Sequence, residues 1–184
     1  MKKIIIISNT SFSIEKFREH YLSRIKKFNF VIYTPNSTPI LKRKYKNIEL
    51  KKFNSNNIFD DFNKLNQIFQ KENPKRIIVY TFKYQLIVSL LKKIFNFKYD
   101  IISIVAGLGS LHLGNIFKRI FFYSKSRLIT KISKFVICIN PYDFNIFYNL
   151  TTNKKKTFKL PTEGVEQIIR NKKRIIDKKN FIFF

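Results

Sequence analysis

The sequence has few of the residues on which several classes of protein depend. Its 184 residues include no tryptophan and a single cysteine, Cys138, within the apolar run FVICI. One cysteine excludes an internal disulfide framework and a cysteine-rich metal site, and it fits a reducing cytoplasm. We expect Cys138 to be a buried, unreactive thiol.

The long apolar segments of membrane-spanning and exported proteins are also missing. No run reaches the roughly 18 uninterrupted apolar residues that suggest a spanning helix. The amino-terminal MKKIIIIS is basic at its start, but its apolar run is too short for a signal peptide. We therefore expect a cytoplasmic protein.

Acidic residues are scarce. The chain has 11 Asp and Glu against 37 Lys and Arg, which gives a formal net charge of +26. A polyanionic partner, either nucleic acid or an anionic membrane surface, would explain this excess. Compositional drift is the other explanation, because Lys, Ile, Asn and Phe are the residues that an AT-rich coding sequence favours. The lysines are spread along the whole chain rather than gathered in blocks, which fits drift.

What is abundant is the alternation of apolar strands with amphipathic helices, and 45% of the residues are hydrophobic. The expected strands are 2–8, 30–34, 48–53, 76–81, 100–106, 134–140 and 156–161. The expected helices are 13–27, 58–71, 84–95, 115–131 and 141–149. This alternation predicts an α/β fold, a Rossmann-like parallel sheet with right-handed crossovers and helices on both faces.

Four loops at the carboxyl ends of these strands are the candidate binding region, because open parallel sheets bind ligands there. They are residues 8–13, the loop that begins at Thr81, residues 106–114, and the loop with Asn140 and Pro141. Gly107, Gly109 and Gly114 are three of only four glycines in the chain, and they follow the strand 100–106. Grouped glycines let backbone N–H groups approach a phosphate, although a tight strand-to-helix turn has the same composition. The pattern is neither a dinucleotide fingerprint nor a Walker loop.

Hydroxyl and cationic side chains occupy two of the other loops. Ser11, Ser13 and Arg18 surround the expected start of the first helix and could hold an anion there, and helix capping by Ser13 is the simpler alternative. Thr81 and Lys83 follow the strand 76–81, where the lysine is placed to meet a phosphate. We see no metal-ligand cluster, no Ser-His-Asp spacing and no Gly-x-Ser-x-Gly elbow. His112 in the glycine loop could be a general base, and a surface histidine is the simpler alternative.

The helix expected at 115–131 combines apolar and basic residues. One stripe of the helix holds Phe117, Ile120, Phe121, Ser124 and Leu128, and basic residues lie largely around it. Such a helix can rest on anionic lipid, or its apolar stripe can cover the sheet.

These segments together resemble the N-terminal domain of family 4-like glycosyltransferases of the GT-B type, in the subgroup that extends undecaprenyl-diphosphate-linked oligosaccharides. The matching segments are SNTSFSIEKFR, VYTFKYQLIVSLL, IVAGLGSL and FVICINPYDFNIF followed by KLPTEGVE. The likeness spans about residues 2–167. It departs from the subgroup at Ala106, where relatives often have a polar or acidic residue.

The resemblance implies one lobe of a two-lobed enzyme that transfers a sugar from a nucleotide-sugar to a polyprenyl-diphosphate-linked glycan. Residues 1–161 would be the acceptor-side domain, and 162–184 a hinge and the first strand of a donor domain that is missing. Such an enzyme would use no cofactor besides its nucleotide-sugar co-substrate, and it would lie on the inner face of the cell membrane. The expected binding residues are Ser11, Ser13, Arg18, Thr81, Lys83, Gly107, Leu108 and Gly109.

Two other functions stay open. The charge suits a nucleic-acid-binding protein, but the chain lacks a helix-turn-helix, a zinc finger and an aromatic RNA-binding signature. A non-catalytic protein that recruits a separate donor-domain subunit to the membrane is the other alternative.

Overall fold

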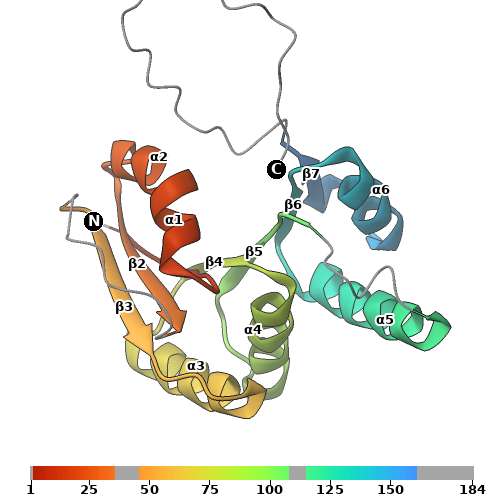
Figure 1. The fold of residues 1–184 in the computed structure, drawn as a ribbon, viewed down its shortest axis with the longest axis horizontal. Coiled ribbons are helices and arrows are strands. Elements are labelled where there is room, and N and C mark those ends of the chain that lie inside the picture. The colour runs from red at the N-terminus through yellow and green to blue at the C-terminus, as the bar shows by residue number, and fades with distance from the viewer. Residues whose placement is uncertain (1, 36–45, 108–114, 161–184) are drawn as a thin grey trace, which may run out of the picture.

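The computed structural model describes residues 2–35, 46–107 and 115–160, and it contains a seven-stranded, wholly parallel sheet (Figure 1). The strands are β1 (Lys2–Ile7), β2 (Phe28–Pro35), β3 (Ile48–Phe53), β4 (Arg76–Tyr80), β5 (Asp100–Val105), β6 (Phe135–Cys138) and β7 (Thr157–Lys159). The helices are α1 (Ser11–Phe17), α2 (Glu19–Arg24), α3 (Ile58–Glu72), α4 (Phe82–Phe95), α5 (Ile116–Ile132), α6 (Pro141–Leu150) and the 3₁₀ turn η1 (Lys154–Lys156).

The strand order is β3-β2-β1-β4-β5-β6-β7, so the chain reverses direction across the sheet between β1 and β4. This confirms the Rossmann-like α/β fold that the sequence predicts. The strand expected at 48–53 is the edge strand β3, and β7 forms the opposite edge.

The packing of β1 explains why its residues 4–7 are all isoleucine. Ile5 and Ile7 pack with residues of α3 and α4 on one face. Ile4 and Ile6 pack with residues of α1 and α2 on the other face. Since successive side chains of a strand point to opposite faces, a strand covered on both sides needs a continuous apolar run.

The helices α5 and α6 cover the β5–β6 part of the sheet. Phe122 and Phe147 are fully buried against Val105 and Cys138. Burial, with a smaller contribution from the charge of Asp143, raises the pKa of the Cys138 thiol to about 12. The thiol is therefore buried and protonated, as the sequence predicts.

The helix expected at 13–27 is wrong in its bounds. α1 begins earlier, at Ser11, because the Thr10 hydroxyl caps it by accepting from the Ser13 backbone N–H at 3.2 Å. Arg18 then leaves helical geometry, with φ −131° and ψ −31°, and the chain continues as α2. Ser13 is therefore inside a helix and is not its cap.

Two parts of the sequence prediction lie outside the described residues. They are the hinge and extra strand expected at 162–184, and Leu108, Gly109, His112 and Gly114 in the glycine loop. Among the helices that the structure describes, none combines the length and apolarity needed to cross a bilayer.

Candidate functional site

Three of the loops picked out in the sequence lie together at the carboxyl ends of the strands, which we call the carboxyl edge of the sheet. β1 and β5 both pair with β4, in parallel, with Ile7 opposite Val79 and Tyr80 opposite Ile104. The carboxyl ends of the three strands therefore lie next to one another. The loops that follow them, which contain Ser11, Thr81 and Gly107, begin at the same edge.

The serine-rich turn after β1 is held mainly by bonds within itself. The Ser13 hydroxyl donates to the Thr10 carbonyl at 3.1 Å and lies 3.1 Å from the Ser8 hydroxyl. The Ser8 backbone N–H donates to the Tyr33 carbonyl of β2. Ser11 is almost fully buried. These contacts give the turn a structural role, and a role of Ser11 or Ser13 in ligand binding stays a prediction.

Arg18 is buried, with 5% of its surface exposed, and it joins α1 to the end of β4. Its Nη1 donates to the Ser13 carbonyl at 2.9 Å, and its guanidinium carbon lies 3.9 Å from the centroid of the Tyr80 ring. This cation–π contact with a buried ring fixes the helix over the strand end. Anion binding by Arg18 stays a prediction.

Thr81 has a strained backbone. It follows β4 with φ 67° and ψ 137°, a combination that non-glycine residues rarely adopt. Its Oγ1 is buried and has no hydrogen-bond partner among the described residues. Strain of this kind gathers at functional sites, which supports the choice of this loop.

Lys83 forms an ion pair with Asp61, a contact that the sequence analysis missed. Asp61 is fully buried in the first turn of α3, whereas the Lys83 side chain is 45% exposed. The two residues join the amino-terminal ends of α3 and α4. Burial, and after it the charge of Asp61, raises the pKa of neighbouring Tyr84 to about 12.

A signal for Asp61 was present in the sequence. Leu65 and Phe69 lie four and eight residues after it, and both are buried core residues of α3. A carboxylate on the apolar stripe of a helix must be buried, so it needs a cationic partner.

Gly107 has the conformation that a glycine is expected to supply. Its φ is +133°, and it is exposed at the end of β5. A Cβ built there would meet no heavy atom within 4 Å. The backbone conformation, and not lack of space, therefore explains why this position is glycine.

Gln85, in the first turn of α4, connects two strand ends behind this loop. Its Nε2 donates to the Ile104 carbonyl at 2.8 Å and to the Val79 carbonyl at 3.4 Å. The residue is buried, and its backbone N–H donates to the Thr81 carbonyl. One side chain therefore links the first turn of α4 to the ends of both β4 and β5, which are also paired with each other.

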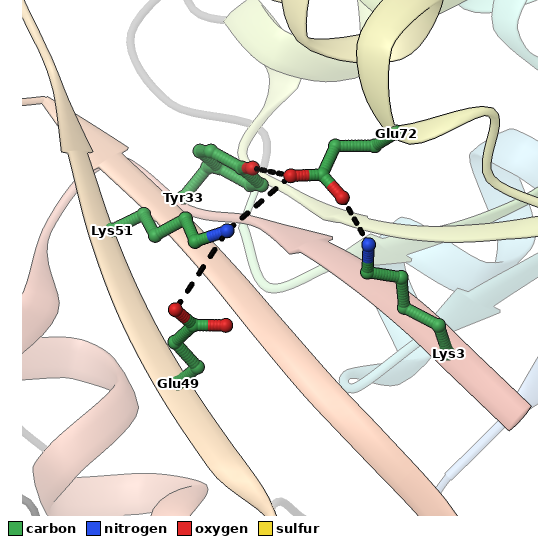
Figure 2. A network of polar contacts seen from close by, with 5 residues as sticks. All are labelled: Lys3, Tyr33, Glu49, Lys51 and Glu72. Carbon is green, nitrogen blue, oxygen red and sulfur yellow. Dashed lines mark hydrogen bonds and ion pairs between the residues drawn. The ribbon is translucent and has the colours of Figure 1, made fainter. Parts of the chain in front are cut away.

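A hollow of about 730 Å³ opens at the opposite, amino edge of the sheet. It is lined by Lys3, Arg76 and Asp100, near the starts of three strands, and by Glu72 at the end of α3. Figure 2 shows that Lys3 and Glu72 are joined there by an ion pair. We place the candidate site at the carboxyl edge, because helix amino termini and strand ends converge there.

The described residues contain no group of three or more His, Cys, Asp and Glu side chains arranged to hold a metal ion. No catalytic residue is assigned. Ala106, which directly precedes Gly107, has no side-chain group that could act as an acid or a base. The candidate site is thus a set of backbone donors, Thr81 and the Lys83 cation.

Comparison with known proteins gives a fold and not a family. No protein-family model matches the sequence, and no curated protein matches it. Solved structures do match. UDP-N-acetylglucosamine 2-epimerase from Rickettsia bellii aligns with a TM-score of 0.62 at 16% identity, over 89% of this chain and 45% of that one.

A sucrose-phosphate synthase and a galactosyltransferase match in the same way. Sucrose-phosphate synthase from Thermosynechococcus elongatus has a TM-score of 0.64 at 11% identity, over 88% of this chain and 48% of that one. The lipopolysaccharide outer core galactosyltransferase WaaB has a TM-score of 0.56 at 12% identity, over 85% and 44%.

This chain spans about half the length of each of these three structures. It shares the Rossmann-like fold of enzymes of GT-B type that act on sugars, at identities that establish the fold alone.

Proposed function

We propose that this chain is the acceptor-side lobe of a glycosyltransferase that moves a sugar from a nucleotide-sugar to a polyprenyl-diphosphate-linked glycan. The observation that carries the proposal is the meeting of the β1, β4 and β5 loops at one sheet edge, with Thr81 strained and Gly107 at positive φ. The shared fold with sugar-transferring enzymes supports it.

In this proposal the diphosphate of the acceptor lies against the edge formed by Thr81, Lys83 and Gly107. The amino-terminal N–H groups of α4, a helix of 14 residues, carry partial positive charge. The Lys83 ammonium adds a full charge, and an anion would compete with Asp61 for it. Ser11, Ser13, Arg18, Leu108 and Gly109 are proposed to complete the acceptor site.

A second lobe would supply the nucleotide-sugar site, either on the same polypeptide or on a separate subunit. We therefore expect residues 1–184 alone to transfer no sugar to a polyprenyl-diphosphate acceptor. Measurable transfer by the purified chain would refute this division of labour.

Acceptor binding tests the proposal directly. Calorimetric titration with a water-soluble, short-chain prenyl-diphosphate-linked sugar should show binding that free glycan does not reproduce. The variant D61N/K83Q removes both charges of the Asp61–Lys83 pair, so it avoids leaving an uncompensated carboxylate. It should bind about tenfold more weakly, because a charge-assisted phosphate contact is lost.

Lys98→Gln is the matched control, because Lys98 is an exposed lysine at the opposite edge of the sheet. An equal loss in K98Q and D61N/K83Q would reject the proposed site. Tight binding of duplex or single-stranded nucleic acid with a steep salt dependence would instead favour the nucleic-acid alternative.

The acceptor is a membrane lipid, so the proposal also places the protein at the cytoplasmic face of the cell membrane, bound peripherally. Cell fractionation should find the chain with the membranes and should release it at high salt, if the attachment is partly electrostatic.

A further inference from the structure

The amino-terminal part of α5 exposes a group of large apolar side chains. Their exposed fractions are 67% for Ile116, 77% for Phe117, 58% for Ile120 and 54% for Phe121. They occupy positions i, i+1, i+4 and i+5 of about one and a half turns of helix. Four neighbouring apolar residues with this exposure form a patch rather than scattered surface residues.

The rest of α5 is anchored to the body of the protein. Phe122 and Ile129 are fully buried against β5, β6 and α6, and Ser126 is also fully buried. Residues 115–121, by contrast, are all exposed. Figure 1 shows α5 extending outward past the end of the sheet. The exposed turns therefore project from the protein, while the buried remainder of α5 holds them in place.

The charge of α5 is of one sign. Its 17 residues include Lys118, Arg119, Lys125, Arg127 and Lys131 and no Asp or Glu. Lys125 lies with its Nζ 3.3 Å from the centroid of the Phe121 ring, so a cation directly adjoins the apolar patch. This arrangement is complementary to a surface that has an apolar layer beneath an outer layer of negative charge.

We propose that residues 116–121 insert into the surface of an anionic lipid bilayer, with the four apolar side chains among the acyl chains and the neighbouring cations at the headgroups. A helix that lies in the interface buries its apolar side chains to about 5–10 Å. A protein partner fits less well, because lysine is depleted from the centres of protein–protein interfaces.

The inference deepens the membrane location in the proposed function, but its test omits the acceptor, so that the two can fail separately. Vesicles of phosphatidylcholine with phosphatidylglycerol, free of any polyprenyl lipid, are sedimented with the full chain. Binding is expected to vesicles with phosphatidylglycerol and to be at least about tenfold weaker to pure phosphatidylcholine, because each basic residue near an anionic surface contributes separately.

The variant F117S/F121S should bind about tenfold or more weakly, because it removes two large inserting side chains. Phe59→Ser is the matched control, since Phe59 is also 77% exposed but lies on α3. It should bind as the unaltered chain does. Thermal unfolding of both variants should match that of the unaltered chain, because the replaced side chains are exposed.

The variant K118Q/R119Q tests the charge. It should weaken binding to anionic vesicles about tenfold and reduce the salt dependence. Three results would overturn the inference: no binding to anionic vesicles, equal binding to neutral ones, or a loss in F59S as large as in F117S/F121S.

Discussion

The hydroxyl of Tyr33 on β2 donates a 2.8 Å hydrogen bond to Oε1 of Glu72, the last residue of α3. Figure 2 shows that Lys3 and Lys51 contact the same carboxylate. The Lys51 Nζ lies 3.3 Å from Oε1 of Glu72. Hydrogen bonding from Lys3 is the largest cause that lowers the pKa of Glu72, from 4.5 to about 2, and burial opposes it. Three donors thus tie the end of α3 to the sheet.

Glu72→Gln should lower the free energy of unfolding at pH 7 by about 2 kcal/mol, because hydrogen bonds to a charged group are lost. A depressed pKa gives stability that is fully present above pH 4.5 and is lost as the pH falls through about 2. The difference between the variant and the unaltered chain should therefore be constant above pH 5 and should shrink below it. Denaturant titrations at several pH values measure this.

The control for that prediction is Glu49→Gln, which makes the same chemical change on β3, the strand that carries Lys51. The Glu49 side chain is 45% exposed and lies 3.7 Å from the Lys51 ammonium. Exposed ion pairs contribute little, so the change should stay below about 0.5 kcal/mol. An E49Q effect equal to that of E72Q would show that net charge, and not the Glu72 contacts, causes the loss.

Lys83→Met should destabilise the protein by about 3 kcal/mol, because it leaves the fully buried Asp61 carboxylate without its ion-pair partner. The double variant D61N/K83M should recover much of that loss. Lys93→Met, on the last turn of the same helix, is the control and should change stability little. Urea unfolding of the unaltered chain, K83M, D61N and D61N/K83M gives the coupling energy, and additive effects would contradict the pairing.

Thr81→Gly should raise the free energy of unfolding by about 1 kcal/mol, because glycine adopts a φ near 67° without the cost that a Cβ imposes. Thr81→Ala keeps the Cβ and should give no such gain. Differential scanning calorimetry of the two variants is sufficient. A more stable T81A than T81G would mean that the buried hydroxyl, and not the backbone, is the source of strain.

The fold could be predicted from local patterns because its strands are covered on both faces. The run of isoleucines at Ile4–Ile7 has no polar alternation, which is typical of a central parallel strand. The break at Arg18 could not be predicted. The residues around it have helical spacing, and the break accompanies a contact with Tyr80, far along the chain.

The site was harder to predict from the sequence, because its contacts also join residues that are far apart along the chain. Its loops follow from strand order, so Ser11, Thr81 and Gly107 could be grouped in advance. The Asp61–Lys83 pair joins two helices, and nothing local to either residue names its partner. The strain at Thr81 is also a property of the folded backbone, which the letters Thr-Phe-Lys do not encode.

Gln85 makes one carboxamide serve acceptors on two strands. An apolar replacement such as leucine would remove the donor for both carbonyls at once, so β4 and β5 would lose their common tether together. The two strand ends are also paired with each other, with Tyr80 opposite Ile104, so Gln85 adds a link from α4 to an existing strand pair. A shift of the α4 amino terminus would therefore be transmitted through that group to both strands at the candidate site.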